Sequence, residues 1–286
     1  MTPSQVEGDV WFQPKGQVLA GISNSMVRLY REHFGKGPTG AKTYVLDDLV
    51  ICVLRDGLTT VEKTLFEQGR GDAVREMRAA FQDAVSDRFT GAVEELTGRT
   101  VLAFMSQAHV APDLAIEVFL LDGAVAANGS HGTPARDEEG TATADASSTT
   151  NDGPELTGEN LRRISSAIVG LYSEHFGKGP TGAKTYVLDD LVICVLRDGL
   201  TTVEKTLFER GKGDVVREMR AAFQDAVADR FTSTIEHLTD RKVVAFMSQA
   251  HVGPDLAIEV FCLDEPVGPV GAVEVTTADT EDERLG

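Results

Sequence analysis

Apolar residues recur at helical spacing near the start of the chain. Between residues 16 and 34 they lie three or four positions apart, which places them on one face of an amphipathic helix. The same pattern returns 142 residues later. The residues of the two faces are Leu19, Ile22, Met26, Leu29 and Tyr30, and then Leu161, Ile164, Ile168, Leu171 and Tyr172. Each segment predicts a helix with one buried side.

Runs rich in β-branched and aromatic residues lie before and after a second helical region, and they predict strands. Asp47 and Asp48 separate the first two runs and predict a tight hairpin turn, repeated at Asp189 and Asp190. Neighbouring strand residues point to opposite faces, so these carboxylates are not expected to act as an acid/base pair. The four predicted strands are Lys42–Leu46, Leu49–Leu54, Thr100–Gln107 and Leu114–Leu121.

Two helices are predicted between the strand pairs. Thr59 and Glu62 have the spacing of a capping box, which predicts a short helix that ends near Glu67. After a glycine-rich interruption, Asp72 is expected to cap a long helix that Gly98 ends. Apolar residues four positions apart form its expected core stripe, which consists of Met77, Phe81, Val85, Phe89 and Val93.

These elements predict an α+β fold. A helix, two strands, a long helix and two strands form a two-layer α/β sandwich, with a four-stranded, mainly antiparallel sheet. The chain carries this unit twice, because residues 32–67 and 174–209 are identical and similarity continues beyond them. The repeat predicts two copies of one fold.

Composition sets the boundaries of the two units. They are predicted at 15–122 and 159–264, each with a net charge of −3. Residues 123–158 and 265–286 contain few large apolar side chains, and each segment has a net charge of −5. These two segments predict a disordered acidic linker and a disordered acidic tail.

Charge and apolar content exclude several classes of protein. An acidic chain without a basic cluster is not expected to bind nucleic acid. No apolar stretch reaches the ~20 residues of a membrane span, and the first residues lack the apolar core of a signal peptide, so we expect a cytoplasmic protein. Cys52, Cys194 and Cys262 lack the spacing of a zinc site and are expected to be buried, reduced thiols.

A glycine-rich loop after the first helix of each unit is the best candidate for a ligand site. In such a loop backbone N–H groups can converge on an anion, and lysine adds positive charge. The loop also fits a helix C-cap followed by a turn, and it lacks the Walker spacing. The candidate anion-binding residues are Gly35, Lys36, Gly37 and Lys42 in the first unit and Gly177, Lys178, Gly179 and Lys184 in the second.

The remaining polar residues do not assemble into a catalytic motif. His33 and His175 lie where a cation complements the helix dipole. His109 and Glu117 could form a polar cluster, repeated at His251 and Glu259, although we expect them on the solvated surface. No nucleophile elbow and no metal-binding motif is present. We therefore expect no enzymatic activity, no metal and no cofactor.

Several motifs occur in the same order in both units. They are Gly-Lys-Gly-Pro, Lys-Thr-Tyr, the acidic hairpin, Leu-Thr-Thr-Val-Glu and the closing Val-Phe. Together they resemble the MpsC domain family over about 16–122 and again over about 158–264. The family is named for a Na+-translocating membrane-potential-generating system. The resemblance implies a peripheral or regulatory component beside membrane-embedded subunits that transport sodium or bicarbonate.

Three functions remain open from the sequence. The first is a non-catalytic binding or regulatory protein that acts through contacts with a protein partner. The second is a sensor of a small anion or a nucleotide that uses the Gly-Lys-Gly-Pro loops, and the third is an enzyme of unrecognised type. The two near-identical units also predict an intramolecular pseudo-dimer, because self-complementary patches pair with approximate twofold symmetry.

Overall fold

The computed structural model describes residues 16–125, 156–267 and 271–276. The first repeat contains α1 (Gly16–Phe34), β1 (Gly40–Leu46), β2 (Leu49–Arg55), α2 (Thr60–Glu67), α3 (Gly71–Thr97), β3 (Val101–His109) and β4 (Leu114–Leu121). The second repeat contains α4 (Gly158–Phe176), β5 (Gly182–Leu188), β6 (Leu191–Arg197), α5 (Thr202–Glu209), α6 (Gly213–Thr239), β7 (Val243–His251) and β8 (Leu256–Leu263). A further strand, β9 (Gly271–Thr276), follows.

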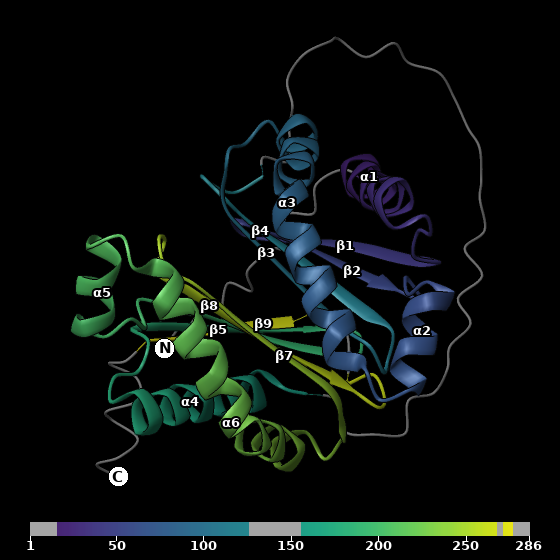
Figure 1. Cartoon of the computed structure of the whole chain (residues 1–286). Helices are drawn as coiled ribbons and strands as arrows, with labels where there is room; N and C mark the ends of the chain where they lie inside the picture. Colours follow the sequence, from purple (N-terminus) through teal and green to yellow (C-terminus); the bar gives the residue numbers. More distant parts are fainter. Residues whose placement is uncertain (1–15, 126–155, 268–270, 277–286) are drawn as a thin grey trace, which may run out of the picture.

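Each repeat is an antiparallel sheet covered by helices on one face, which confirms the predicted fold class (Figure 1). The first sheet has the order β1-β2-β4-β3, and the second repeats it as β5-β6-β8-β7. The long helices pack on the sheet through Tyr30, Phe89 and Phe119 in the first repeat. The predicted capping box is present, since Thr59 Oγ1 accepts a hydrogen bond from the backbone N–H of Glu62.

The core stripe predicted along α3 is wrong in its first half. Phe89 and Val93 are fully buried, but Met77 is 46% exposed and Phe81 is half-buried. Residues four apart turn by about 40° per step, so the two ends of a five-residue stripe point in directions that differ by about 160°. The buried face near the start of the helix therefore consists of other residues, of which Arg78 and Gln82 are the polar ones.

The helix also begins differently from the prediction. Arg70 is the N-cap residue of α3 and makes no side-chain capping hydrogen bond. Asp72 lies inside the first turn, where it pairs with Arg75. Asp72 therefore does not cap the helix, although a carboxylate in the first turn still complements the helix dipole. The predicted stop at Gly98 is confirmed, since this residue is the left-handed C-cap.

The second sheet has a strand that the sequence did not predict. β9 pairs antiparallel with β5, with Gly271 opposite Val187 and Thr276 opposite Gly182. These residues belong to the segment 265–286, for which the composition predicts disorder, so that prediction is wrong for 271–276. Val267 is buried as well. Ala-Val-Glu-Val-Thr is a short run with strand propensity, but the glycines and prolines before it and the acidic residues after it make the whole segment look disordered.

The predicted linker falls mostly on 126–155, which lies outside the described residues.

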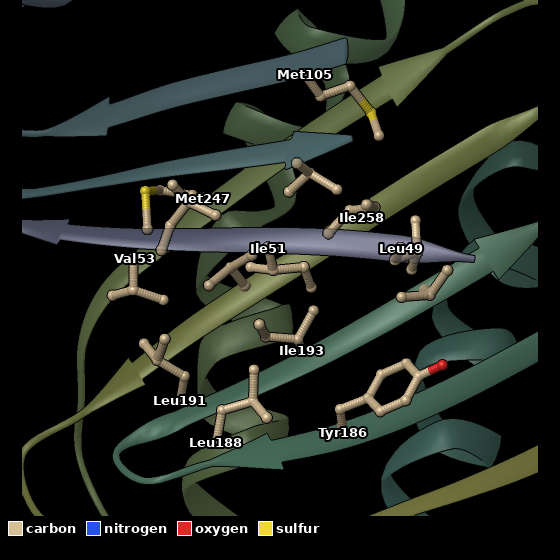
Figure 2. Packing of buried hydrophobic residues seen from close by; sticks show 14 of the residues in the cluster. Leu49, Ile51, Val53, Met105, Tyr186, Leu188, Leu191, Ile193, Met247 and Ile258 are labelled. Carbon is tan, nitrogen blue, oxygen red and sulfur yellow. The ribbon is translucent and has the colours of Figure 1, made fainter. Parts of the chain in front are cut away.

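The face of each sheet that the helices do not cover is also apolar. These two faces, one from each repeat, pack against each other. One buried cluster contains side chains of both repeats, including Ile51 and Met105 of the first and Ile193 and Met247 of the second. Figure 2 shows these side chains between two layers of strands. The structure thus places the two repeats in contact, as pairing within the chain requires. The continuous apolar runs of the inner strands are typical of sheets buried on both faces.

Candidate functional site

The Gly-Lys-Gly-Pro loop forms a tight exit from the first helix of each repeat. Gly35 and Gly177 have φ values of +76° and +74°, a left-handed conformation that favours glycine. Gly37 lies so close to α1 that an added Cβ would be 2.9 Å from the backbone oxygen of Val27. The left-handed backbone therefore explains Gly35, and close packing against the helix explains Gly37.

The loop lysines bind backbone carbonyl groups of their own repeat. Lys36 Nζ donates to the carbonyl oxygen of Leu58 at 2.8 Å. Lys178 Nζ donates to the carbonyl oxygens of Asp198 and Leu200 at 2.7 and 2.8 Å. Each ammonium group ties the loop to the segment before the short helix. Anion binding at these loops stays a prediction, which a rise in melting temperature with phosphate, bicarbonate or nucleotide tests.

The other two predicted lysines lie elsewhere. Lys42 and Lys184 are on β1 and β5, away from the loops, and each pairs with an aspartate of the opposite repeat. Lys42 Nζ lies 2.5 Å from Asp189, and Lys184 Nζ lies 2.7 Å from Asp47. The structure therefore does not bring these lysines together with the glycine loops.

The paired aspartates make reciprocal contacts across the interface between the repeats. Arg55 donates to both carboxylate oxygens of Asp190, at 2.7 and 2.8 Å. Arg197 donates in the same way to Asp48, at 2.8 and 3.0 Å. Asp47 has a φ of +56°, so the predicted turn is also present. The turn was predictable from the sequence but its partners were not, because the residues of a hairpin tip do not indicate which residues face them.

A cluster of polar residues lies buried between the helices and the sheet in each repeat. Tyr30 Oη donates to Glu117 Oε1 at 2.5 Å, and Gln82 Nε2 donates to both of these groups at 2.8 and 2.9 Å. Tyr172, Gln224 and Glu259 make the same contacts in the second repeat. Glu117 and Glu259 are fully buried, so their expected place on the solvated surface is wrong.

Burial changes the acidity of this cluster. It raises the pKa of the Glu117 carboxyl to about 7, although the hydrogen bond from Tyr30 acts in the opposite direction. Burial also raises the pKa of Tyr30 well above its ordinary value, and the nearby Glu117 carboxylate adds to this shift. Glu117 Oε2 has no hydrogen-bond partner among the described residues. The carboxyl group can thus hold a proton near neutral pH.

A buried ion pair joins α2 to α3 beside the cluster. Arg78 Nε and Nη2 donate to the two oxygens of Glu62 at 2.6 and 2.9 Å, and Nη2 also donates to the carbonyl oxygen of Gly57 at 3.0 Å. Burial opposes ionisation of Glu62, but the hydrogen bonds from Arg78 and Thr59 outweigh it and lower the pKa of this carboxyl. Arg220 and Glu204 form the same pair in the second repeat.

The predicted histidines do not join these clusters. His33 lies against Phe81, and its Nε2 is 3.3 Å from Arg88. His109 contacts the carbonyl oxygen of Pro112 through Nδ1, at 3.3 Å. Burial lowers the pKa of His109.

The sequence did not predict Tyr30 and Gln82 as partners of Glu117, or Arg78 as the partner of Glu62. Polar residues at helix positions that face the sheet are the signal that could have indicated them.

A comparison with protein families identifies the chain. The family described as "Na+-translocating membrane potential-generating system (MpsC)" matches residues 14–123 and 157–265. The chain belongs to the MpsC family. Its two MpsC domains coincide with the two structural repeats, so the resemblance noted in the sequence is confirmed. No curated protein and no solved structure shows significant similarity to the chain.

A polar cavity of about 600 Å³ lies where the two MpsC domains meet. Gln82, Ser106 and His109 of the first domain line it, together with Asp225 and Met247 of the second. Ser106 lies opposite Glu117 in the β3–β4 pair, and its counterpart Ser248 lies opposite Glu259, to which it donates at 3.0 Å. The cavity therefore reaches the neighbourhood of the buried carboxyl cluster.

The three cysteines are free and buried, as predicted. Burial raises the pKa of Cys52 and of Cys194 to about 12, so both are thiols at neutral pH. Within the described ranges, no group of three or more histidine, cysteine or acidic residues could hold a metal ion. The helices of the described part are too short or too polar to cross a membrane.

Proposed function

We propose that the chain is a non-catalytic binding and regulatory protein, and a peripheral component of the membrane system for which the MpsC family is named. Its two domains act as one body, an intramolecular pair with approximate twofold symmetry. Cytoplasmic location belongs to the same proposal. The family description supports the link to a cation-translocating system. The reciprocal contacts of Arg55 with Asp190 and of Arg197 with Asp48 support the pairing.

Exposed apolar side chains at matching positions of the two domains carry this proposal. Val61 on α2 and its counterpart Val203 on α5 are each 69% exposed. Phe66 and Phe208 on the same helices are 40% and 43% exposed. These side chains provide apolar surface on two short helices that a protein partner can bury. The duplication presents this surface twice, which suits a partner that binds both domains.

The buried polar groups support a structural role for the interior. Arg78 and Glu62 bind each other, and Tyr30 and Gln82 both donate to Glu117. Buried charges without partners are costly, and these are paired or hydrogen-bonded within one domain. The interior thus holds the helices in place, and recognition falls to the surface.

Affinity capture from cells that produce the protein tests the proposal. The tagged chain is expected to retain a membrane-embedded transport subunit from the detergent-solubilised membrane fraction. The double variant Val61→Glu/Val203→Glu is expected to lose that subunit, because a charge on each α2-type helix prevents apolar contact. The purified subunit must then bind the purified chain directly, with at least a tenfold weaker affinity for the variant.

Leu102→Glu/Val244→Glu is the matched control. These residues are 51% and 41% exposed and lie at the start of β3 and β7, so the control adds the same charge to both domains at another surface. It is expected to retain the subunit. Equal loss in both double variants, or capture of soluble proteins alone, would refute the proposed function.

A further inference from the structure

The strand β9 shows what the outer edge of an MpsC sheet can bind. It lies antiparallel along β5, at the edge opposite to β6. β1 has the same sequence as β5, since residues 40–46 and 182–188 both read Gly-Ala-Lys-Thr-Tyr-Val-Leu. In the part of the chain that the structure describes, no strand pairs with the outer edge of β1. Two edges of one sequence therefore differ in occupancy.

The difference in occupancy is visible in the burial of the two strands. Ala183 and Val187 on β5 are 1% and 2% exposed, whereas their counterparts Ala41 and Val45 on β1 are only half-buried. The side chain of Lys42 is 59% exposed, compared with 21% for that of Lys184. The edge of β1 thus exposes apolar surface and backbone groups. The equivalent groups of β5 are covered by β9. Such an edge is a template for another strand.

Within the described residues, β9 is the one tail strand beside these two sheet edges. At the repeat distance of 142 residues, Gly271–Thr276 corresponds to residues 129–134. The tail reads Gly-Ala-Val-Glu-Val-Thr, but residues 129–134 read Gly-Ser-His-Gly-Thr-Pro. Residues 129–134 have low strand propensity, because they contain a proline and two glycines and lack both valines. Two domains that are nearly identical elsewhere differ in the segment that would cover this edge.

We propose that the outer edge of β1 is a docking site for an extended strand of a partner protein. The strand adds antiparallel to the first sheet, as β9 adds to the second. Its chemistry follows from the pairing of β9, in which Glu274 lies opposite Lys184 and a valine lies on either side of it. The partner strand therefore carries β-branched residues around an acidic residue that lies opposite Lys42. The inference rests on the proposed binding function and assigns a surface to it.

A synthetic peptide of residues 268–280 is the probe, with the full-length chain as its receptor. Isothermal titration is expected to give one peptide per chain, because β9 already occupies β5. A peptide with Ala272→Pro and Val273→Pro is expected to bind at least tenfold more weakly. Adjacent prolines remove two neighbouring N–H groups, and one of these faces β1 in either alignment.

A graft variant controls for binding elsewhere on the chain. Residues 129–134 are replaced by Gly-Ala-Val-Glu-Val-Thr, so that the first domain has a strand of its own. This variant is expected to lose the peptide site.

The register of the added strand is tested separately with a Glu274→Cys peptide and the Lys42→Cys chain. Directly opposite residues of an antiparallel pair are close enough for a disulfide, so the cross-link forms only with this alignment.

Three results would overturn the proposal. One is the absence of peptide binding to the full-length chain. Another is binding that the graft leaves unchanged. The third is binding that requires removal of residues 1–14, which would show that the chain covers β1 itself. The titration contains no membrane subunit, so its outcome is independent of the capture experiment on α2 and α5.

Discussion

At the scale of single residues, the interior of each domain contains more polar groups than its apolar pattern suggests. Arg78 is among the largest fully buried side chains, and Glu117 is fully buried beside Tyr30. Arg78 is stable there because it pairs with Glu62, and the Glu117 carboxyl accepts hydrogen bonds from Tyr30 and Gln82 through one of its oxygens. Apolar residues of the same helix, such as Phe89, contribute the dispersion and desolvation terms of the core.

Phe89→Ala is expected to destabilise the first domain by about 3–5 kcal/mol, because it removes a fully buried ring. The ring stacks on Phe104 with centroids 5.8 Å apart. Phe81→Ala removes the same side chain from a half-buried position of the same helix and is the control, with a smaller loss. Urea unfolding measures both, and equal losses in the two variants would contradict the assigned burial.

The buried carboxyl groups predict a pH dependence of stability. Glu117 and Glu259 have folded pKa values of about 7, above the ordinary value of 4.5. A raised carboxyl pKa stabilises the fold below the unfolded pKa, and this stability is lost as pH rises through the folded value. The free energy of unfolding should therefore fall between about pH 4.5 and 7, by at most about 3 kcal/mol per carboxyl.

Glu117→Gln/Glu259→Gln is expected to remove that part of the pH profile. Urea unfolding at several pH values measures the difference between the variant and the unmodified chain. The lowered pKa values of His109 and His251 act in the opposite direction, and the subtraction cancels them because both proteins retain these histidines. A difference that stays constant from pH 4.5 to 7 would contradict the assignment.

At the scale of elements, α2 depends on a connection to α3. α2 has only eight residues, which is too short for a helix to be stable alone in water. Its capping box begins the helix, and the Glu62–Arg78 pair attaches it to α3. The side chain that completes the cap thus also makes the tertiary contact.

Arg78→Met is expected to destabilise the first domain by about 3–5 kcal/mol, because it leaves the Glu62 carboxylate buried without its partner. Glu62→Met/Arg78→Met should lose less, since no buried charge remains. Chemical denaturation of both variants and of Glu62→Met completes a double-mutant cycle. A double variant less stable than Arg78→Met would show that the pair itself, and not the isolated charge, determines the loss.

At the scale of the whole molecule, the two domains share one apolar interface with charged pairs at its margin. The interface core includes Ile51 and Ile193, which are fully buried. The Arg55–Asp190 and Arg197–Asp48 pairs are partly exposed. They therefore fix the orientation of one domain against the other more than they stabilise the interface. The same contact could join domains of two chains, and the tether within one chain favours the intramolecular form.

Cleavage between the domains is expected to leave them associated. A protease site inserted into residues 126–155 allows the cut, and the two fragments should co-elute as a particle of the size of the intact chain. Ile51→Asp/Ile193→Asp should separate the fragments, because it places two carboxylates in the apolar interface. Val61→Asp/Val203→Asp, on exposed positions, is the matched control and should leave them together. Fragments that separate without any substitution would contradict the pairing.

The sequence by itself determined the local structure of this protein. Apolar spacing predicted α1, turn-forming residues predicted the hairpin at Asp47, and the spacing of Thr59 and Glu62 predicted the cap of α2. The duplication predicted two copies of one fold, and the motifs identified the family. These features depend on residues a few positions apart, whose backbone preferences act wherever the segment lies.

Only the tertiary structure decided which distant residues meet. Glu117 looks like a surface carboxylate in the sequence, but Tyr30 lies 87 positions away and supplies its partner in the folded domain. The same holds for Asp190 and Arg55, which come from different repeats. β9 forms a strand because it pairs with the free edge of β5. This pairing supplies backbone hydrogen bonds that such a short segment cannot make alone. Contacts of this kind depend on topology, and a linear pattern does not record them.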